Sequence, residues 1–443
     1  MKEHIHCIGI GGIGVSALAR LYRAKGWRVS GSDLARSEIT DALKKEGIRV
    51  FIGPHRRSHL GSNVTRVIYT AAVKPSNPEL REAKRRKLKA QSYAQALGEL
   101  TKGYQTIAVA GSHGKSTTTA MVALLLTRAG LDPTVIVGTK LREFGNTNFR
   151  LGGSEYLVIE ADEYRGSFWH YRPWTAVITN IDREHLDFYR NLRGVTRGFQ
   201  RFAERVRPDG HLVLSADDTA LEGIARRGNP ITKNRIRWFS ARDREAEILK
   251  LKLKIPGAHN VLNALAAYRV GEILGIPKRQ ILDALQRYRG SWRRFDYQGE
   301  FAGTKVFADY AHHPTEIRAT LQAAREKFPG SRIWCVFQPH HYERTRNLFS
   351  EFSSAFDGAD AAFLFDIYEV AGRERKRKGS GVNSERLAKA ISKRGTPALY
   401  LKNPARLKPF FSRWLKPGDV LLMMGAGSIW ETTKDLMKAN SKK

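Results

Sequence analysis

The stretch Thr106-Ile-Ala-Val-Ala-Gly-Ser-His-Gly-Lys-Ser-Thr-Thr-Thr119 decides the fold of the middle of the chain. An apolar run typical of a buried strand meets Gly111-Ser-His-Gly-Lys-Ser-Thr117, and a helical pattern follows from Ala120 to Ala129. A glycine-rich turn between a strand and a helix is the layout of a phosphate-binding loop, in which N–H groups at the helix start approach phosphate oxygens. The loop is shorter than the common form, because Val109 stands where the first glycine would be.

The residue types in this loop favour the binding of a nucleoside triphosphate. Lys115 would reach the β- and γ-phosphates as a point charge, and the hydroxyl of Ser116 or Thr117 would help to hold Mg²⁺. The predicted ATP-binding residues of the loop are Gly111, Ser112, His113, Gly114, Lys115, Ser116 and Thr117. The alternative is a glycine turn that only joins a strand to a helix.

The composition is that of a globular protein with an unusual charge. The chain has 443 residues and a formal net charge of +33. Basic runs at 84–89 and 373–378 are candidates for nucleic-acid binding, but excess arginine is spread over the whole chain and neither run contains interleaved aromatic residues. We therefore favour solvated surface charge and a field that attracts anionic substrates over nucleic-acid binding.

Two further features bear on the compartment. No apolar run approaches the ~18 residues needed to cross a membrane, and the N-terminus lacks the pattern of a secretion signal. Cys7 and Cys335 both lie in apolar strand-like runs, which indicates buried thiols in a reducing environment. We therefore expect a cytoplasmic protein without a membrane span, and the sequence leaves both a monomer and a homodimer open.

Alternating strand and helix patterns predict an α/β fold with parallel sheets, and the length favours about three domains of roughly 150 residues each. We expect a Rossmann-like domain over 1–101, a central domain with a parallel sheet of the P-loop ATPase type over 102–288, and a Rossmann-like α/β domain over 289–443. The predicted strands include 5–10, 28–30, 49–52, 66–70, 156–160, 175–179, 304–308, 332–337, 361–365 and 420–424.

A second glycine-rich loop lies near the N-terminus. Gly9-Ile-Gly-Gly-Ile-Gly14 follows the first predicted strand and opens a helix, which places a diphosphate on the helix N-terminus. Asp33 ends the next strand, about where an acid would bind a ribose. These residues fit an NAD(P)-binding domain, but the loop indicates only a diphosphate, which a nucleotide sugar also contains. The stretch 69–73 and the following Asn77-Pro78-Glu79 indicate only an exposed strand end.

Polar residues after two apolar segments are further candidates. Glu160 ends the run Tyr156-Leu-Val-Ile-Glu160, and an acid at the carboxyl end of a parallel strand can hold Mg²⁺ that bridges phosphates; the alternative is a helix cap or a surface acid. Asp162 and Glu163 are weaker candidates that could lie behind a metal ligand. Asn260 and Asn263 can hydrogen-bond an adenine edge, or cap a helix instead.

With both loops in one chain, the sequence resembles the Mur ligases, the ATP-dependent enzymes that add amino acids to the peptidoglycan precursor. The resemblance covers essentially the full length and is greatest to the branch that adds L-alanine. The motifs that carry it, in the family order, are Gly9–Gly14, Gly111–Thr117, Glu160-Ala-Asp-Glu163, Thr179-Asn-Ile-Asp-Arg-Glu-His185, Gly257–Ala264, Arg293-Arg-Phe295, Asp309-Tyr-Ala-His-His-Pro-Thr-Glu316 and Phe337-Gln-Pro-His340.

The resemblance implies that the first domain binds UDP-N-acetylmuramate. In that domain it assigns to this substrate Gly11, Gly12, Gly14, Asp33, His55 and Thr70. In the middle domain it makes His185 a ligand of a second Mg²⁺, in addition to the metal candidates Ser116 and Glu160. Several relatives position a metal with a carbamylated lysine after this motif, but residues 141–232 contain no lysine, which agrees with the alanine-adding branch.

For the third domain, the resemblance assigns Arg294 and Asp309 to ATP, and His312, His340 and Arg344 to the other substrates. Asp309 would hold the ATP ribose or orient the domain. The family has arginine where His341 stands, so one expected anchor for the amino acid's carboxylate is missing, and Arg344 or Arg346 would have to compensate.

The implied reaction joins the lactyl carboxylate of UDP-N-acetylmuramate to L-alanine through an acyl phosphate, with ATP and Mg²⁺. Its implied catalytic residues are Lys115, Glu160, His185 and Arg294. The nearest alternative is the recycling ligase that joins a whole tripeptide to the same sugar nucleotide. More distant alternatives are an NAD-dependent oxidoreductase, an ATPase stimulated by nucleic acid, and a family member that only binds.

Overall fold

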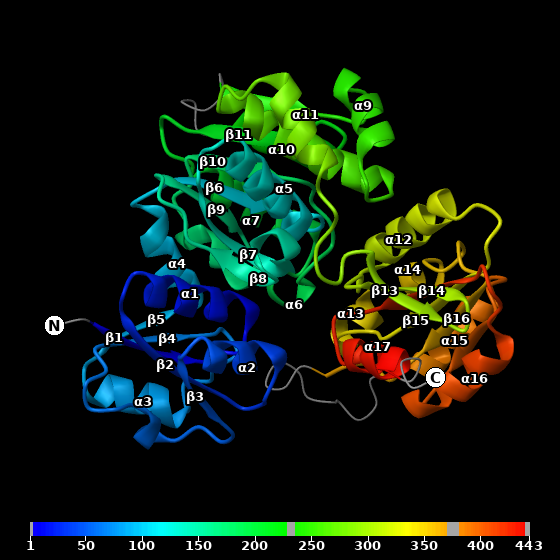
Figure 1. Ribbon diagram of the computed structural model, residues 1–443, viewed down its shortest axis with the longest axis horizontal. Coiled ribbons are helices and arrows are strands. Elements are labelled where there is room, and N and C mark those ends of the chain that lie inside the picture. The colour runs from blue at the N-terminus through cyan, green and yellow to red at the C-terminus, as the bar shows by residue number, and fades with distance from the viewer. Residues whose placement is uncertain (1–2, 228–234, 370–380, 439–443) are drawn as a thin grey trace. The chain divides into compact units, whose positions relative to one another are not determined.

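The computed structural model describes residues 3–227, 235–369 and 381–438, and it contains three α/β sheets (Figure 1). The chain divides into two compact units. The first unit, residues 1–251 and 262–288, holds the first two sheets, and the second unit, residues 252–261 and 289–443, holds the third. The basic run at 373–378 lies outside the described residues.

The first sheet is parallel, with the order β3-β2-β1-β4-β5, as expected for a Rossmann-like domain. Its strands are β1 (His4–Ile8), β2 (Arg28–Asp33), β3 (Arg49–Ile52), β4 (Arg66–Tyr69) and β5 (Lys89–Ser92). Its helices are α1 (Ile13–Ala24), α2 (Glu38–Lys45), η1 (Arg57–His59), α3 (Pro78–Arg85) and α4 (Tyr93–Thr101). Apolar side chains of β1 and α1 are almost completely buried, which fixes the glycine loop between them.

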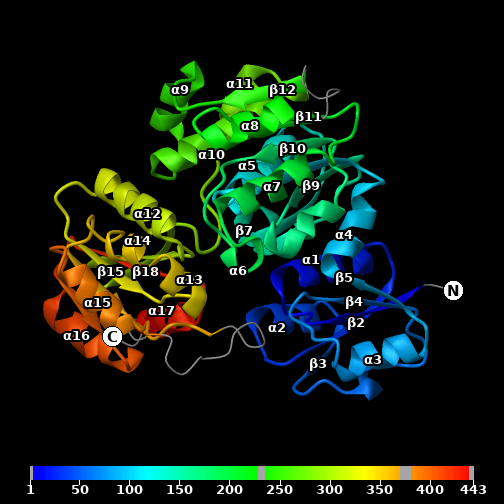
Figure 2. The ribbon, with the colours of Figure 1, turned by 180° about the vertical axis from the view of Figure 1, so that it is seen from behind.

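The second sheet has the order β12-β11-β10-β6-β9-β7-β8, and only the β7–β8 pair is antiparallel. Its strands are β6 (Gln105–Ala110), β7 (Thr134–Leu141), β8 (Thr147–Arg150), β9 (Tyr156–Glu160), β10 (Thr175–Ile178), β11 (His211–Ser215) and β12 (Ile236–Phe239). Its helical segments are α5 (Lys115–Arg128), η2 (Arg142–Phe144), η3 (Tyr164–His170), α6 (Leu186–Tyr189), α7 (Leu192–Ala203), α8 (Thr219–Arg227), α9 (Arg244–Lys252), α10 (Ala258–Ile273) and α11 (Lys278–Gln286). Buried α5 packs on β7 and β9, and the same arrangement is visible from behind in Figure 2.

The third sheet has the order β13-β14-β18-β15-β16-β17, with an antiparallel β13–β14 pair at one edge. Its strands are β13 (Asp296–Phe301), β14 (Thr304–Asp309), β15 (Ile333–Phe337), β16 (Ala361–Leu364), β17 (Ala398–Tyr400) and β18 (Val420–Met424). Its helical segments are α12 (Pro314–Lys327), α13 (Tyr342–Asn347), α14 (Phe349–Ser353), α15 (Ser384–Ser392), η5 (Pro404–Arg406), α16 (Leu407–Trp414) and α17 (Ile429–Lys438).

Several sequence predictions are confirmed. Both cysteines are free and buried, Cys7 in β1 and Cys335 in β15. Among the described residues, none of the helices is long and apolar enough to span a bilayer. Two predictions are wrong. The helix after the phosphate loop begins at Lys115, five residues before the expected Ala120, because the loop glycine Gly114 leads directly into it. Glu79 is not at an exposed strand end but is fully buried in the first turn of α3.

Candidate active site

The predicted phosphate loop follows β6 and leads into α5 as expected. Gly111 has φ +136° and Gly114 has φ +83°, a region that favours glycine. A side chain at Gly111 would collide with Thr179, and one at Gly114 would collide with Asn263. The chain therefore needs glycine at both positions to bring the loop close to its neighbours. Because α5 begins here, the N–H groups of its first turn have no acceptor within the helix, which suits an anion.

The segment after β10 braces the loop. The N–H of His113 donates to the side-chain oxygen of Asn180 at 2.9 Å, and the Thr179 hydroxyl donates to the carbonyl of His113 at 2.6 Å. The ring of His113 lies 2.9 Å from Asp182 Oδ2, and Asp182 N–H donates to the Ser112 hydroxyl at 2.8 Å. These contacts engage the N–H and the ring of His113 within the protein and hold the loop in one shape.

Lys115 is folded back onto the loop. Its Nζ donates to the carbonyls of Gly111 at 2.6 Å and Ser112 at 3.1 Å, and to Glu163 Oε1 at 3.0 Å. Glu163 is 1% exposed, and burial raises its pKa against the opposing effect of Lys115, whereas the neighbouring acids raise the pKa of Lys115 itself despite its burial. The pair places an ammonium group beside the start of α5.

Acidic groups and a histidine gather next to this lysine. Asp162, Glu163 and His185 each offer a ligand atom, and these atoms all lie within 4.8 Å of one another. His185 Nε2 lies 3.6 Å from Glu163, and its ring packs against Tyr164. Two carboxylates from one loop and an imidazole from the next form a donor set that fits a divalent cation, although imidazole is unusual for Mg²⁺.

Glu160, a metal candidate from the sequence, lies outside this group of three possible metal ligands. It ends β9 as expected, but its Oε2 accepts the N–H of Gly138 in β7 at 2.8 Å, and it is not part of the three-residue group. Ser116, which is 3% exposed, lies in the first turn of α5. This group contains Glu163, a weaker candidate from the sequence, and the metal role of Glu160 stays a prediction.

In the first domain, the glycine loop is held by the acid predicted to contact a ribose. Asp33 Oδ2 accepts the N–H of Gly11 at 2.8 Å, and the N–H of Gly12 donates to the carbonyl of Gly9 at 3.1 Å. Thr70 N–H donates to the carbonyl of Ile8 at 3.1 Å, so the end of β4 lies beside the loop. Gly11, Gly12, Asp33 and Thr70 are therefore brought together, with Asp33 acting as a brace.

The loop of the first domain is also tied to the second sheet. Asn148 of β8 is 1% exposed, and its amide N–H groups donate to the Ile13 carbonyl and to the Ser16 hydroxyl. Arg20 donates to Asn148 Oδ1 at 2.7 Å and to Glu46 at 2.8 to 3.0 Å. The first turn of α1, which carries the glycine loop, is thus fixed by a residue of the β7–β8 hairpin.

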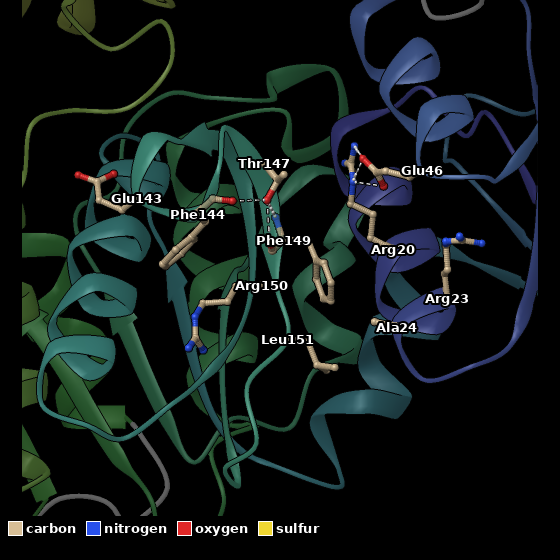
Figure 3. A pocket seen from close by; sticks show the side chains of 10 residues that line it. All are labelled: Arg20, Arg23, Ala24, Glu46, Glu143, Phe144, Thr147, Phe149, Arg150 and Leu151. Carbon is tan, nitrogen blue, oxygen red and sulfur yellow. Dashed lines mark hydrogen bonds and ion pairs between the residues drawn. The ribbon is translucent and has the colours of Figure 1, made fainter.

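A cavity of about 580 Å³ opens beside this connection (Figure 3). Its lining residues come from the end of α1, from Glu46 and from η2 and β8. The dashed lines in Figure 3 mark the Arg20–Glu46 pair and the hydrogen bonds of Thr147. None of the predicted site residues lines this cavity, because it lies at the opposite end of α1 from the glycine loop.

Within the second unit, the structure gathers the remaining predicted residues at the ends of β14 and β15. The rings of His312 and His340 lie 6.0 Å apart, and Arg344 Nη1 is 3.5 Å from His340 Nδ1. Arg294 lies over the ring of Tyr310, whereas Arg346 is 3.6 Å from Glu343. Arg344, rather than Arg346, therefore accompanies the histidines.

Asp309 and the two asparagines have structural partners. Asp309 accepts the N–H groups of Phe295 and Ala311, both at 2.7 Å; burial raises its pKa to about 6 against the opposing effect of Arg294. Both contacts lie within the second unit, and the ribose contact and the orienting role of Asp309 both stay predictions. Asn260 donates to the Pro256 carbonyl at 2.6 Å in the second unit, and Asn263 accepts from Thr118 at 3.2 Å in the first.

Sequence comparison finds one family along the chain. Residues 4–105 match the Mur ligase family catalytic domain, residues 109–271 the Mur ligase middle domain, and residues 293–427 the glutamate ligase domain of Mur ligases. The UDP-N-acetylmuramate–L-alanine ligases of Clostridium kluyveri and Alkaliphilus metalliredigens are each 39% identical. These alignments cover 97% of this chain, and 97% and 95% of the two relatives.

Solved structures agree with the sequence comparison. The crystal structure of the UDP-N-acetylmuramate–alanine ligase from Thermotoga maritima has a TM-score of 0.82 at 28% identity, with 99% of this chain and 100% of that chain covered. A murein peptide ligase from Psychrobacter arcticus has a TM-score of 0.71 at 24% identity, covering 99% of this chain and 98% of that one, which shows the fold alone. Together with the three domain matches, these findings show that the chain belongs to the Mur ligase family.

Proposed function

We propose that this protein is an ATP-dependent ligase that forms an amide bond between the lactyl carboxylate of UDP-N-acetylmuramate and L-alanine. The observation that carries the proposal is the presence of two separate anion cradles in the first unit. One is the glycine loop before α1, and the other is the loop Gly111–Gly114 with Lys115 before α5. The near full-length relatives that carry this activity in their names support the choice of substrates.

The proposed reaction has two chemical steps. A lactyl carboxylate oxygen attacks the γ-phosphorus of ATP, which forms an acyl phosphate and releases ADP. The neutral amine of L-alanine then attacks the acyl carbon, the carbon–oxygen bond to phosphate breaks, and the amine loses a proton. Activation is required because a free carboxylate is a poor electrophile.

Residues of this chain would neutralise the charge of the phosphates and position the reacting groups. Lys115 would exchange Glu163 for phosphate oxygens, because the same ammonium cannot fully satisfy both. The first turn of α5 would hold the phosphates with its N–H groups. Charge neutralisation and alignment of this kind account for most catalysis in phosphoryl transfer. Arg294 remains a predicted ATP contact, because it belongs to the second unit and Lys115 to the first.

Mg²⁺ is part of the proposal. The residues that would hold it are Asp162, Glu163 and His185, with Ser116 and Glu160 as the further candidates from the sequence. When bound, the ion would neutralise phosphate charge and orient oxygens for in-line transfer.

The test is phosphate release by the full-length protein with ATP, Mg²⁺ and UDP-N-acetylmuramate, with each amino acid supplied in turn. We expect release with L-alanine and little with D-alanine or with the tripeptide. Release that needs the tripeptide would assign the recycling activity instead. Release without any sugar nucleotide, or tight NADH binding at the N-terminal domain, would contradict the proposal.

A further inference from the structure

A buried carboxylate in the first domain organises a group of histidines. Glu79 is completely buried at the start of α3, and its two oxygens accept from His6 Nε2 at 2.9 Å, Ser32 Oγ at 2.7 Å, His55 Nδ1 at 3.0 Å and His59 Nδ1 at 2.9 Å. We call Glu79 with these three histidines the Glu79 cluster. A fourth imidazole, that of His4, reaches it through Ser30, which bonds both His4 and His6 at 2.9 Å.

The cluster joins α3 to four other parts of the first domain. His6 belongs to β1, Ser32 to β2, His55 to the segment after β3, and His59 to η1. Ser32 directly precedes Asp33, which accepts the N–H of Gly11. Glu79 therefore contacts the residue next to Asp33, the side chain that holds the glycine loop of the predicted sugar-nucleotide site.

The electrostatics of the cluster hold Glu79 in its ionised form. Burial alone would raise the pKa of Glu79, but hydrogen bonds from His6 and Ser32, together with the positive field of His6, lower it to about 2. At neutral pH the carboxylate can only accept hydrogen bonds, so each imidazole must carry a proton on the nitrogen that faces it.

This constraint fixes what His55 presents to its surroundings. A neutral His55 that donates from Nδ1 has a lone pair on Nε2 and can only accept there. No polar partner is found for Nε2 of His55 among the described residues, and that atom is not among the buried unsatisfied ones. The outer edge of the ring is thus available as a hydrogen-bond acceptor.

We propose that Glu79 is a positioning residue of the sugar-nucleotide site, which orients His55 so that Nε2 accepts a hydrogen bond from the nucleoside, either from the ring N–H of the pyrimidine or from a ribose hydroxyl. The inference rests on the proposed function, because His55 is a predicted contact of UDP-N-acetylmuramate. Glu79 touches no substrate itself and acts through His55.

Glu79→Gln tests the proposal in the full-length protein. A glutamine of the same size carries no charge, and its amide turns a donor toward imidazole N–H groups, so His55 loses its fixed tautomer. We expect UDP, used as the probe in calorimetry, to bind about tenfold more weakly, since the hydrogen bond that His55 Nε2 accepts from the nucleoside is lost. ATP binding and kcat at saturating sugar nucleotide should stay unchanged. The matched control is Glu82→Gln on the same helix, where the carboxylate pairs with Arg85 outside the cluster, and it should bind UDP as the parent protein does.

A second variant, His55→Ala, separates this positioning role from a merely structural role of Glu79. In His55→Ala, the further change Glu79→Gln should have no additional effect on UDP binding, whereas an undiminished tenfold loss would overturn the proposal. The groups that face His55 are Glu79 of α3 and Ser32 of β2, with His6 and His59 on the same carboxylate. In the proposal, Glu79 therefore acts on UDP only through the ring of His55.

His55→Ala keeps the proposal testable if Glu79→Gln fails to fold, because His55→Ala should bind UDP about tenfold more weakly than the parent protein, with ATP binding unchanged. UDP binding by His55→Ala equal to that of the parent protein would overturn the proposal. Methylation of the pyrimidine N3 of UDP, compared with a 2′-deoxyribose, distinguishes the two donors. Failure of the proposed function is seen separately, as UDP binding by the parent protein without phosphate release from ATP, UDP-N-acetylmuramate and L-alanine.

Discussion

Lys115 Nζ lies 3.0 Å from Glu163, and this buried ion pair joins the phosphate loop to the acids that follow β9. The remaining donors of the ammonium are taken by the carbonyls of Gly111 and Ser112. A phosphate group that enters the loop would compete with Glu163 for the lysine. Glu163 also belongs to the candidate cation group, so release from Lys115 would free it to bind a metal ion.

Lys115→Met should abolish phosphate release and leave UDP binding intact, because the two cradles lie on different sheets. It also leaves Glu163 buried without its partner, which costs about 3–5 kcal/mol of unfolding free energy. Lys115→Met with Glu163→Gln should recover most of this stability in thermal unfolding but none of the activity. Loss of UDP binding in the single variant would argue against two independent cradles.

Gly138→Ala tests the predicted catalytic role of Glu160, whose carboxylate lies beside Gly138. A Cβ atom on Gly138 would lie 2.5 Å from Glu160 Oε2, and the flexible carboxylate can move aside, so the fold should survive with an unchanged melting temperature. If Glu160 acts in catalysis, its displacement should lower kcat by at least tenfold. Gly130→Ala is a suitable control, because a Cβ there meets nothing within 4 Å, although its φ of +79° costs some stability. An unchanged kcat in Gly138→Ala would remove Glu160 from the catalytic set.

Two strands that sequence patterns predicted well are largely buried. The runs 156–160 and 420–424 match β9 and β18, because parallel strands covered on both faces read as continuous apolar segments. The run 49–52 also matches β3, although β3 is a largely exposed edge strand. The antiparallel edge strands β8 (Thr147–Arg150) and β13 (Asp296–Phe301) were missed, since both are polar. Yet β8 supplies Asn148, which holds the first turn of α1.

The parts of the candidate site that lie within one sequence motif could be predicted. The contacts between residues that are distant in sequence could not. The phosphate loop needs only a strand, two glycines and a helix. Glu79, in contrast, lies 73 residues from its partner His6, and nothing near it in sequence indicates burial. Which acid after β9 is buried is likewise set by packing: Glu163 is 1% exposed, and the sequence around it does not indicate this.

Asp309→Asn should change how stability depends on pH. Burial raises the pKa of Asp309 to about 6 from a usual value of 3.8, so the folded state binds a proton more tightly than the unfolded state. Its ionisation therefore lowers the unfolding free energy as the pH rises from about 4 to 6, by an amount on the order of 3 kcal/mol. Denaturant titrations should show a smaller decline over this range in Asp309→Asn. The variant should be less stable overall, because an amide can accept from only one of the Phe295 and Ala311 N–H groups. A decline equal to that of the parent protein would show that Asp309 does not titrate there.

His341→Arg restores the residue that the family resemblance places at this position. His341 precedes α13 with φ +72°, and its ring packs edge-on against His340, so the site already accommodates a large side chain in this conformation. An arginine would offer two parallel N–H groups to the carboxylate of the amino acid. We expect the KM for L-alanine to fall by about tenfold, the effect of one charged hydrogen bond, with the KM for ATP unchanged. His341→Gln, which lacks the charge, should leave the KM near that of the parent protein. An unchanged KM in His341→Arg would mean that the carboxylate binds elsewhere, and Arg344, which lies beside His340, would then be the side chain to replace.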